Sequence, residues 1–220
     1  MTHIEKIRAQ INQDFDEATF TKADFETFTS PSGGFRLDTT NYWSKEPNWD
    51  LTRVQIFELS SNEKIFDFFS NDGHFFFSWL ETNSIEYIVC AEDLCGGQTI
   101  VDLTNKEMSG FSTGDDGFIW TDFHLSPDGK TLATIGCYWA CPYVIKIFDF
   151  TNPLSLPLSE LKEIELLDND EVILGWVDNE SLKMKGVKRE HEPEYFVDGG
   201  MRLKTISETP MERLVKINGR

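Results

Sequence analysis

Four cysteines are the side chains whose type and spacing could bind a metal ion. They form two close pairs, with four residues between Cys90 and Cys95 and three between Cys137 and Cys141. Four thiolates satisfy the tetrahedral coordination of zinc, so one hypothesis is a zinc-stabilised structural domain. Zinc sites more often have two residues between paired cysteines, and cysteines in a reducing compartment are usually buried thiols. We therefore expect no metal and no cofactor, and keep these four residues as the metal candidates.

Carboxylates and histidines could perform acid–base chemistry if the fold brought them together. Hydrolysis of this kind needs two carboxylates across a pocket, in environments that separate their pKa values. A hydrolase with a central cleft would require Glu58, Asp122, His124 and Asp149 to converge. The chain has 38 acidic residues, however, so neighbouring acids are expected from composition alone. It also contains no Gly-x-Ser-x-Gly, phosphate-binding or dinucleotide-binding motif. We favour a non-catalytic protein, with a hydrolase that uses carboxylates or a metal as the alternative.

Large aromatic residues in two turns could recognise another protein. Segment 136–143 carries three of them between two predicted strands, and segment 42–49 carries three more around a polar turn. Aromatic residues on a rigid scaffold often form recognition surfaces, although they can equally cover the end of a small β core. The predicted partner-binding residues are Tyr138, Trp139, Tyr143, Tyr42, Trp43 and Trp49.

The elements that must position these residues begin with one amphipathic helix, predicted at residues 3–18. Thr2 and Glu5 have the spacing of a capping box, and apolar residues then recur at intervals of three and four. From Phe25 the apolar period falls to two, which indicates strands. We predict a helix with its connector over 1–22 and a single all-β domain over 23–220.

Internal repetition is the strongest indication of architecture. Segments 54–62, 98–106 and 145–153 each place an apolar pair, an acid and an apolar residue before a Ser or Thr with an Asn close by. This pattern predicts a strand that runs into a polar turn. The acids Glu58, Asp102 and Asp149 are 44 and 47 residues apart. Asp-Gly pairs at 72–73 and 128–129 form a second recurring element and predict hairpin turns.

The second of these turns carries a resemblance to a known family. Leu-Ser-Pro-Asp-Gly-Lys-Thr-Leu-Ala-Thr at 125–134, with Tyr-Val-Ile-Lys-Ile-Phe-Asp at 143–149, resembles the blade repeat of WD40-like β-propellers. It is most similar to the bacterial-type repeat of TolB-like proteins, and the resemblance is best over 120–152. The Trp-Asp dipeptide of WD40 repeats is replaced by Phe-Glu at 57–58, Val-Asp at 101–102 and Phe-Asp at 148–149.

The resemblance implies a mainly β fold in which the repeats are blades. A spacing of about 45 residues fits a four-stranded blade. We therefore expect a small or incomplete β-propeller-like array of about four blades, preceded by the N-terminal helix. A twisted β-sandwich built from the same hairpins is the alternative fold.

The charge of the chain narrows the classes of partner. The chain has 20 basic and 38 acidic residues, a net charge of −18, and an isoelectric point near 4.5. This acidity excludes a protein that binds the nucleic-acid backbone and favours a basic protein partner, attracted over a long range. The acidity is uneven, because residues 1–182 carry a net charge of −21 and residues 183–220 a net charge of +3.

Localisation and function follow as expectations. No apolar stretch approaches the roughly 18 residues of a membrane span, and the first residues do not resemble a signal peptide. We expect a cytoplasmic protein that does not contact a membrane. The favoured function is a non-catalytic protein-interaction module with an acidic surface. By analogy, its specific form would be an immunity or antitoxin-type protein that neutralises a basic toxin.

Overall fold

The computed structural model describes residues 1–16, 19–45, 50–114, 117–139, 142–167, 171–195 and 201–217. Over these residues the chain forms one α-helix followed by fifteen β-strands. The helix is α1 (His3–Asp14). The strands are β1 (Phe20–Thr29), β2 (Phe35–Ser44), β3 (Leu51–Glu58), β4 (Glu63–Ser70), β5 (Phe77–Thr82), β6 (Ile85–Cys90), β7 (Gln98–Asp102), β8 (Glu107–Phe111), β9 (Ile119–Leu125), β10 (Thr131–Cys137), β11 (Tyr143–Asp149), β12 (Glu160–Glu165), β13 (Val172–Asp178), β14 (Ser181–Tyr195) and β15 (Met201–Lys216).

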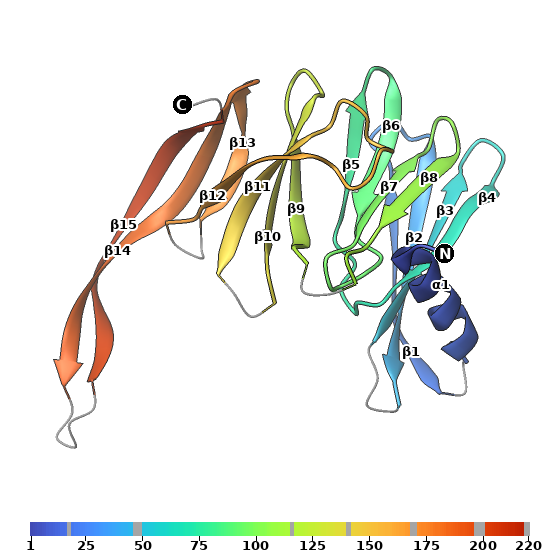
Figure 1. The fold of residues 1–220 in the computed structure, drawn as a ribbon, viewed down its shortest axis with the longest axis horizontal. Coiled ribbons are helices and arrows are strands. Elements are labelled where there is room, and N and C mark those ends of the chain that lie inside the picture. Colours follow the sequence, from blue (N-terminus) through green and yellow to red (C-terminus); the bar gives the residue numbers. More distant parts are fainter. Residues whose placement is uncertain are drawn as a thin grey trace.

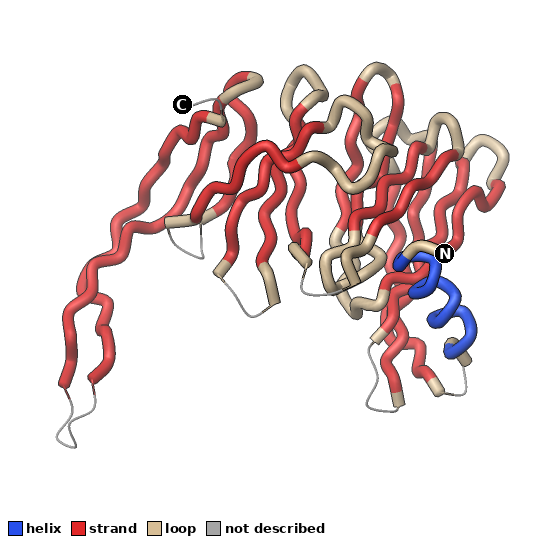
Figure 2. The backbone as a smooth tube through the Cα atoms, viewed as in Figure 1, coloured by secondary structure: helices blue, strands red, loops and turns tan. Residues whose placement is uncertain are grey.

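The strands form four antiparallel sheets in which the order in space is the order in sequence (Figures 1 and 2). We call them blade 1 (β1–β4), blade 2 (β5–β8), blade 3 (β9–β12) and blade 4 (β13–β15). Strand β9 contacts both β5 and β13, so the first strands of neighbouring blades lie next to one another. Figure 1 shows the blades in an open arc. The predicted incomplete propeller-like array, rather than a two-sheet sandwich, is therefore confirmed.

The three repeat segments occupy the same place in three blades. They begin in the third strands β3, β7 and β11 and continue into the turns that follow. The recurring pattern therefore marks one strand of each blade.

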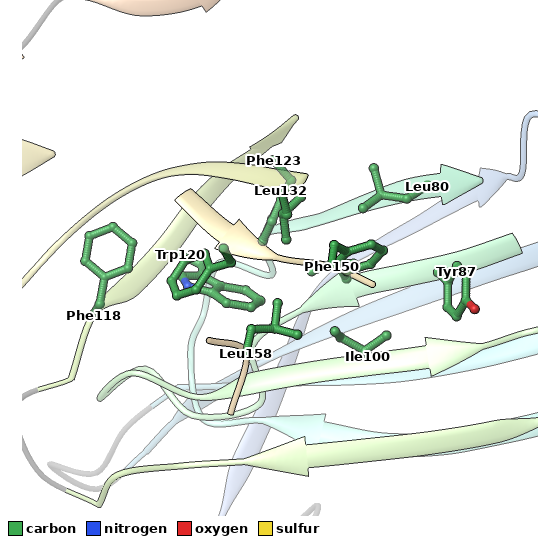
Figure 3. Close-up of a cluster of buried hydrophobic side chains, with 11 residues drawn as sticks. Leu80, Tyr87, Ile100, Phe118, Trp120, Phe123, Leu132, Phe150 and Leu158 are labelled. Carbon is green, nitrogen blue, oxygen red and sulfur yellow. The ribbon is translucent and has the colours of Figure 1, made fainter. Parts of the chain in front are cut away.

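The hydrophobic core is divided into layers between the blades. One cluster lies between blades 1 and 2 and another between blades 3 and 4. The cluster between blades 2 and 3 contains Trp120, Phe148 and Phe150, and Figure 3 shows most of its side chains. Because side chains alternate along a strand, β6 directs Tyr87 toward blade 3 and Ile88 toward blade 1. Both faces of the middle blades are buried, which explains the continuous apolar runs in their strands.

One predicted hairpin turn is confirmed and the other is wrong. Gly129 joins β9 to β10 with a φ of 71°, a left-handed conformation that favours glycine. Asp72-Gly73 instead lies in the connection from β4 to β5, between two sheets. There the carboxylate of Asp72 accepts a hydrogen bond from the backbone N–H of His74 at 2.9 Å. This local side-chain bond forms a turn that requires no hairpin.

Helix α1 begins as predicted and ends earlier. Thr2 accepts a hydrogen bond from the backbone N–H of Glu5, and the Glu5 side chain accepts one from Thr2, which completes the capping box. The helix ends at Asp14 instead of residue 18, because Phe15 takes an extended conformation and packs against Phe20, Tyr42 and Phe69. In the described part of the chain no helix has the length and apolar character needed to cross a membrane.

Candidate interaction surface

The acids of the repeat close turns at the ends of third strands. Asp102 accepts hydrogen bonds from the backbone and side chain of Asn105, each at 2.8 Å. Asp149 accepts a bond from the backbone N–H of Thr151 at 2.9 Å, and Glu58 accepts one from the Ser61 hydroxyl at 2.7 Å. These bonds lower the pKa of Asp149, and the Ser61 bond, together with Lys106, lowers that of Glu58. All three acids stabilise turns, and the lowered pKa values keep Asp149 and Glu58 ionised.

Asp122 and His124 are the two proposed hydrolase residues that come together. They share one face of β9, with 2.8 Å between His124 Nε2 and Asp122 Oδ2. Burial raises the pKa of Asp122, but the bond and charge of His124 outweigh burial, and the net pKa is lowered. Such a pair can orient an imidazole ring as a general base. Glu58 and Asp149 are bonded in their own turns, so the four residues do not form the convergent set that the alternative hydrolase function would require.

A groove with a volume of about 550 Å³ runs beside this pair. Its walls are formed by β5, by β9 with the turn that follows it, and by β13. Trp176 of β13 donates a hydrogen bond from its indole N–H to the carbonyl oxygen of His124 at 3.0 Å, which joins blades 3 and 4 across the groove. The groove is thus a seam between first strands.

The cysteines do not gather into a metal site among the described residues. Cys90 is completely buried at the end of β6, whereas Cys95 and Cys137 are half-buried. Burial raises the pKa of the Cys90 thiol, which opposes the thiolate that zinc requires. Cys141 lies outside the described residues. Within the described ranges, no group of three or more His, Cys, Asp or Glu side chains is arranged to hold a metal ion.

Of the aromatic residues in segment 136–143, Tyr138 is half-buried, whereas Trp139 and Tyr143 are exposed. Tyr138 packs on Phe118, and both rings lie about 5 Å from the ammonium of Lys146. Lys146 is itself buried and binds Glu160 at 2.5 Å. Tyr138 therefore fixes the turn to the body of blade 3. Trp139 is 53% exposed and Tyr143 is 39% exposed, so these two side chains are available to a partner.

The aromatic residues of segment 42–49 also differ in their exposure. Tyr42 is buried and packs edge-on against Phe15 of the N-terminal segment. Trp43 is 58% exposed. Trp49 lies outside the described residues. Only Trp43 of this group is therefore known to be presented at the surface.

Trp43 and Trp139 lie at the same edge of the array. Both are at hairpins that join the second strand of a blade to the third, β2 to β3 in blade 1 and β10 to β11 in blade 3. In Figure 1 the end of β2 with the start of β3, and the end of β10 with the start of β11, lie at the lower edge of the blades. We call the exposed residues Trp43, Trp139 and Tyr143 the aromatic edge.

The sequence reasoning missed two buried acids that position elements. Glu92 receives two hydrogen bonds from Arg8 of α1, and Glu171 receives two from Arg213 of β15. Both carboxylates have only 1% of the side chain exposed. No local pattern marks them among 38 acids, and their partners lie 84 and 42 residues away.

Comparison with known proteins gives one relative in sequence. No family model matches the chain. The uncharacterized protein R762 of Acanthamoeba polyphaga mimivirus is 27% identical over 130 residues. The match covers 57% of this chain and 51% of the relative, so the chain spans about half the length of the curated relative.

Three solved structures are similar in part. The β-propeller domain of Cps50 (Swd1) from Myceliophteria thermophila has 10% identity and a TM-score of 0.40, covering 84% of this chain and 72% of that one. Hydrazine synthase of Kuenenia stuttgartiensis has 10% identity and a TM-score of 0.45, with coverages of 87% and 70%. TolB of Acinetobacter baumannii has 14% identity and a TM-score of 0.25, with coverages of 86% and 56%. The propeller-like architecture of this chain follows from its four sheets, not from these likenesses.

Proposed function

We propose that this chain is a protein-interaction module that binds its partner through the aromatic edge. The observation that carries the proposal is the exposure of Trp139 and Trp43, 53% and 58%, at equivalent hairpins of two blades. Tryptophan is enriched in the residues that dominate binding energy, because one side chain buries a large area with little loss of rotamer freedom. Hairpins on packed blades hold these rings in place before a partner arrives.

The rest of the turn supports a preformed surface. Tyr138 lies against Phe118 and close to Lys146, so the base of the β10–β11 turn is packed, while the nearby Trp139 and Tyr143 stay exposed. A partner would meet two exposed rings on a fixed support. Preorganisation of this kind reduces the entropy lost on binding.

The partner that fits is a basic protein. With a net charge of −18, the chain attracts a cationic partner at long range and accelerates the encounter at low salt. The aromatic edge then supplies the short-range contact. An immunity or antitoxin-type role, in which this cytoplasmic chain neutralises a basic toxin, is the specific form of the proposal.

The experiment is capture of partners from the native cell at low salt, comparing the wild-type chain with Trp139→Ala. We expect a basic protein that the wild type retains and the variant loses, with affinity about 30-fold lower once the pair is purified, the equivalent of about 2 kcal/mol. Leu161→Ala is the matched control, because Leu161 is 55% exposed on β12, away from the aromatic edge. Equal loss in both variants, or an acidic partner, would contradict the proposal.

A further inference from the structure

Blade 4 carries a long hairpin that the other blades lack. Its strands β14 and β15 have 15 and 16 residues. In β14 the buried residues stop at Gly186, just before the pair of Val187 with Pro210. Beyond that pair, residues 188–195 and 201–209 continue as a two-stranded ribbon that projects away from the blades (Figure 1). We call these residues the arm. A lone two-stranded ribbon is marginally stable in water, so an arm of this length needs a surface to pack against.

The two faces of the arm differ in chemistry. Directly opposed pairs on one face are Tyr195 with Met201 and Pro193 with Leu203 toward the tip, followed by the polar pair His191 with Thr205. On the other face, Glu194 opposes Arg202 and Glu192 opposes Lys204. This alternation is typical of a strand pair with one buried and one solvated face.

The apolar face is nevertheless open in the single chain. Tyr195 is 73% exposed, Met201 57% and Leu203 64%. An exposed apolar strip on an otherwise charged ribbon indicates an interface.

The charge of the arm indicates which molecule packs against its apolar face. The described arm residues contain four basic side chains, Lys188, Arg189, Arg202 and Lys204, and four acidic ones, Glu190, Glu192, Glu194 and Glu208. The arm is therefore neutral on a chain with a net charge of −18. A basic partner gains no attraction there, whereas two copies of this chain, which repel each other through their bodies, can approach at their arms with the least repulsion.

We propose that the arm is a self-association element, in which the apolar faces of two arms pack against each other around a twofold axis. Such an interface is isologous, because Tyr195, Met201 and Leu203 of one copy meet the same strip of the second. The projection of the arm also keeps the acidic bodies apart (Figure 1). The residues of this interface differ from those of the aromatic edge, although the arm is the second-to-third-strand hairpin of blade 4.

The test is the oligomeric state of the full chain, measured by sedimentation velocity over a range of concentrations. We expect a wild-type dimer and a dissociation constant about 100-fold weaker in Leu203→Glu, because each dimer loses the apolar contact twice at about tenfold per site. Leu161→Glu is the matched control and should leave the dimer intact, since Leu161 is 55% exposed outside the arm. A wild-type monomer at every concentration would overturn the proposal, as would a dimer unchanged by Leu203→Glu.

The effect of ionic strength distinguishes dimerisation through the arm from binding of a basic partner through the aromatic edge. Higher ionic strength screens the repulsion between the acidic bodies, so the dimer should tighten, whereas capture of a basic partner should weaken. Weakening of the dimer by salt would show that ion pairs, not the apolar face, hold it together. Leu203→Glu should still bind the partner, and Trp139→Ala should still dimerise, so either proposal can fail alone.

Discussion

Arg8 of the N-terminal helix forms a two-pronged ion pair with Glu92 of blade 2. Arg8 Nε donates to Glu92 Oε2 at 2.7 Å and Nη2 donates to Oε1 at 2.6 Å. The Thr99 hydroxyl adds a bond to Oε1 at 2.7 Å. The pair passes over Gly110 of β8, where a Cβ atom would lie 2.7 Å from Arg8 Nη2. One buried carboxylate thus joins the helix to blade 2, in addition to the apolar contacts of the N-terminal segment.

Loss of Arg8 should destabilise the whole chain. In Arg8→Ala, Glu92 keeps a buried charge without its cation, and the expected loss in the free energy of unfolding is about 3 kcal/mol. Urea unfolding measures this loss. Lys6→Ala, an exposed change on the same helix, should alter the value by less than about 0.5 kcal/mol.

A second substitution in the Arg8→Ala background checks the cause. Glu92→Gln removes the buried charge, so the double variant should be more stable than Arg8→Ala alone. If the double variant were less stable than Arg8→Ala, the buried charge would not be the source of the loss.

Gly129 should tolerate alanine much less well than Gly33, although both have left-handed backbones with φ of 71° and 74°. A Cβ atom on Gly129 would lie 1.9 Å from Thr82 Oγ1 in blade 2, while one on Gly33 would meet nothing within 4 Å. Gly33→Ala carries only the conformational cost of about 1 kcal/mol. Gly129→Ala also displaces the contact between blades, so we expect about 2–3 kcal/mol. Equal losses in thermal or urea unfolding would contradict the packing role of Gly129.

Local patterns predicted the elements that depend on local interactions. The capping box at Thr2 and Glu5, the third strands of three blades and the turn at Gly129 each involve residues close in sequence. Pairings between distant residues were not predictable, because nothing near Glu92 or Glu171 indicates an arginine far along the chain. The same limit applies to the aromatic turns, since their composition does not reveal that Tyr42 is buried while Trp43 is exposed.

Acid should remove a stabilising contribution from Asp67 in blade 1. Burial alone would raise its pKa, but hydrogen bonds from Arg53, Lys64 and Gln55 outweigh burial and lower the pKa from 3.8 to about 2. A carboxylate with a lowered folded-state pKa stabilises the fold above its unfolded-state pKa and loses that contribution as the pH falls through its folded-state pKa. Because the site is partly exposed, we expect about 1–2 kcal/mol at neutral pH.

Comparison of wild type with Asp67→Asn over pH isolates this contribution. The difference in the free energy of unfolding should be constant from pH 7 down to the unfolded-state pKa near 3.8 and then shrink toward zero near pH 2. Asp149→Asn serves as a comparison without an ion pair, because among the described residues Asp149 accepts its bonds from the neutral Thr151 in its turn. A difference for Asp67 that grows on acidification would have the wrong sign for this ion-pair cluster.

Cys90 should react with thiol reagents far more slowly than Cys95. Cys90 is completely buried, and burial together with the nearby charge of Glu92 raises its pKa, although Arg8 partly opposes the shift. The thiolate is the reactive form, so labelling of Cys90 requires opening of the fold. Pulsed alkylation followed by peptide mass spectrometry should label half-buried Cys95 first and Cys90 only on unfolding. Arg8→Ala should accelerate labelling of Cys90, because loss of the ion pair with Glu92 makes opening of the fold around Cys90 more frequent. Protection of both cysteines by added zinc, reversed by a chelator, would instead support the metal site that the spacing of the cysteines first suggested.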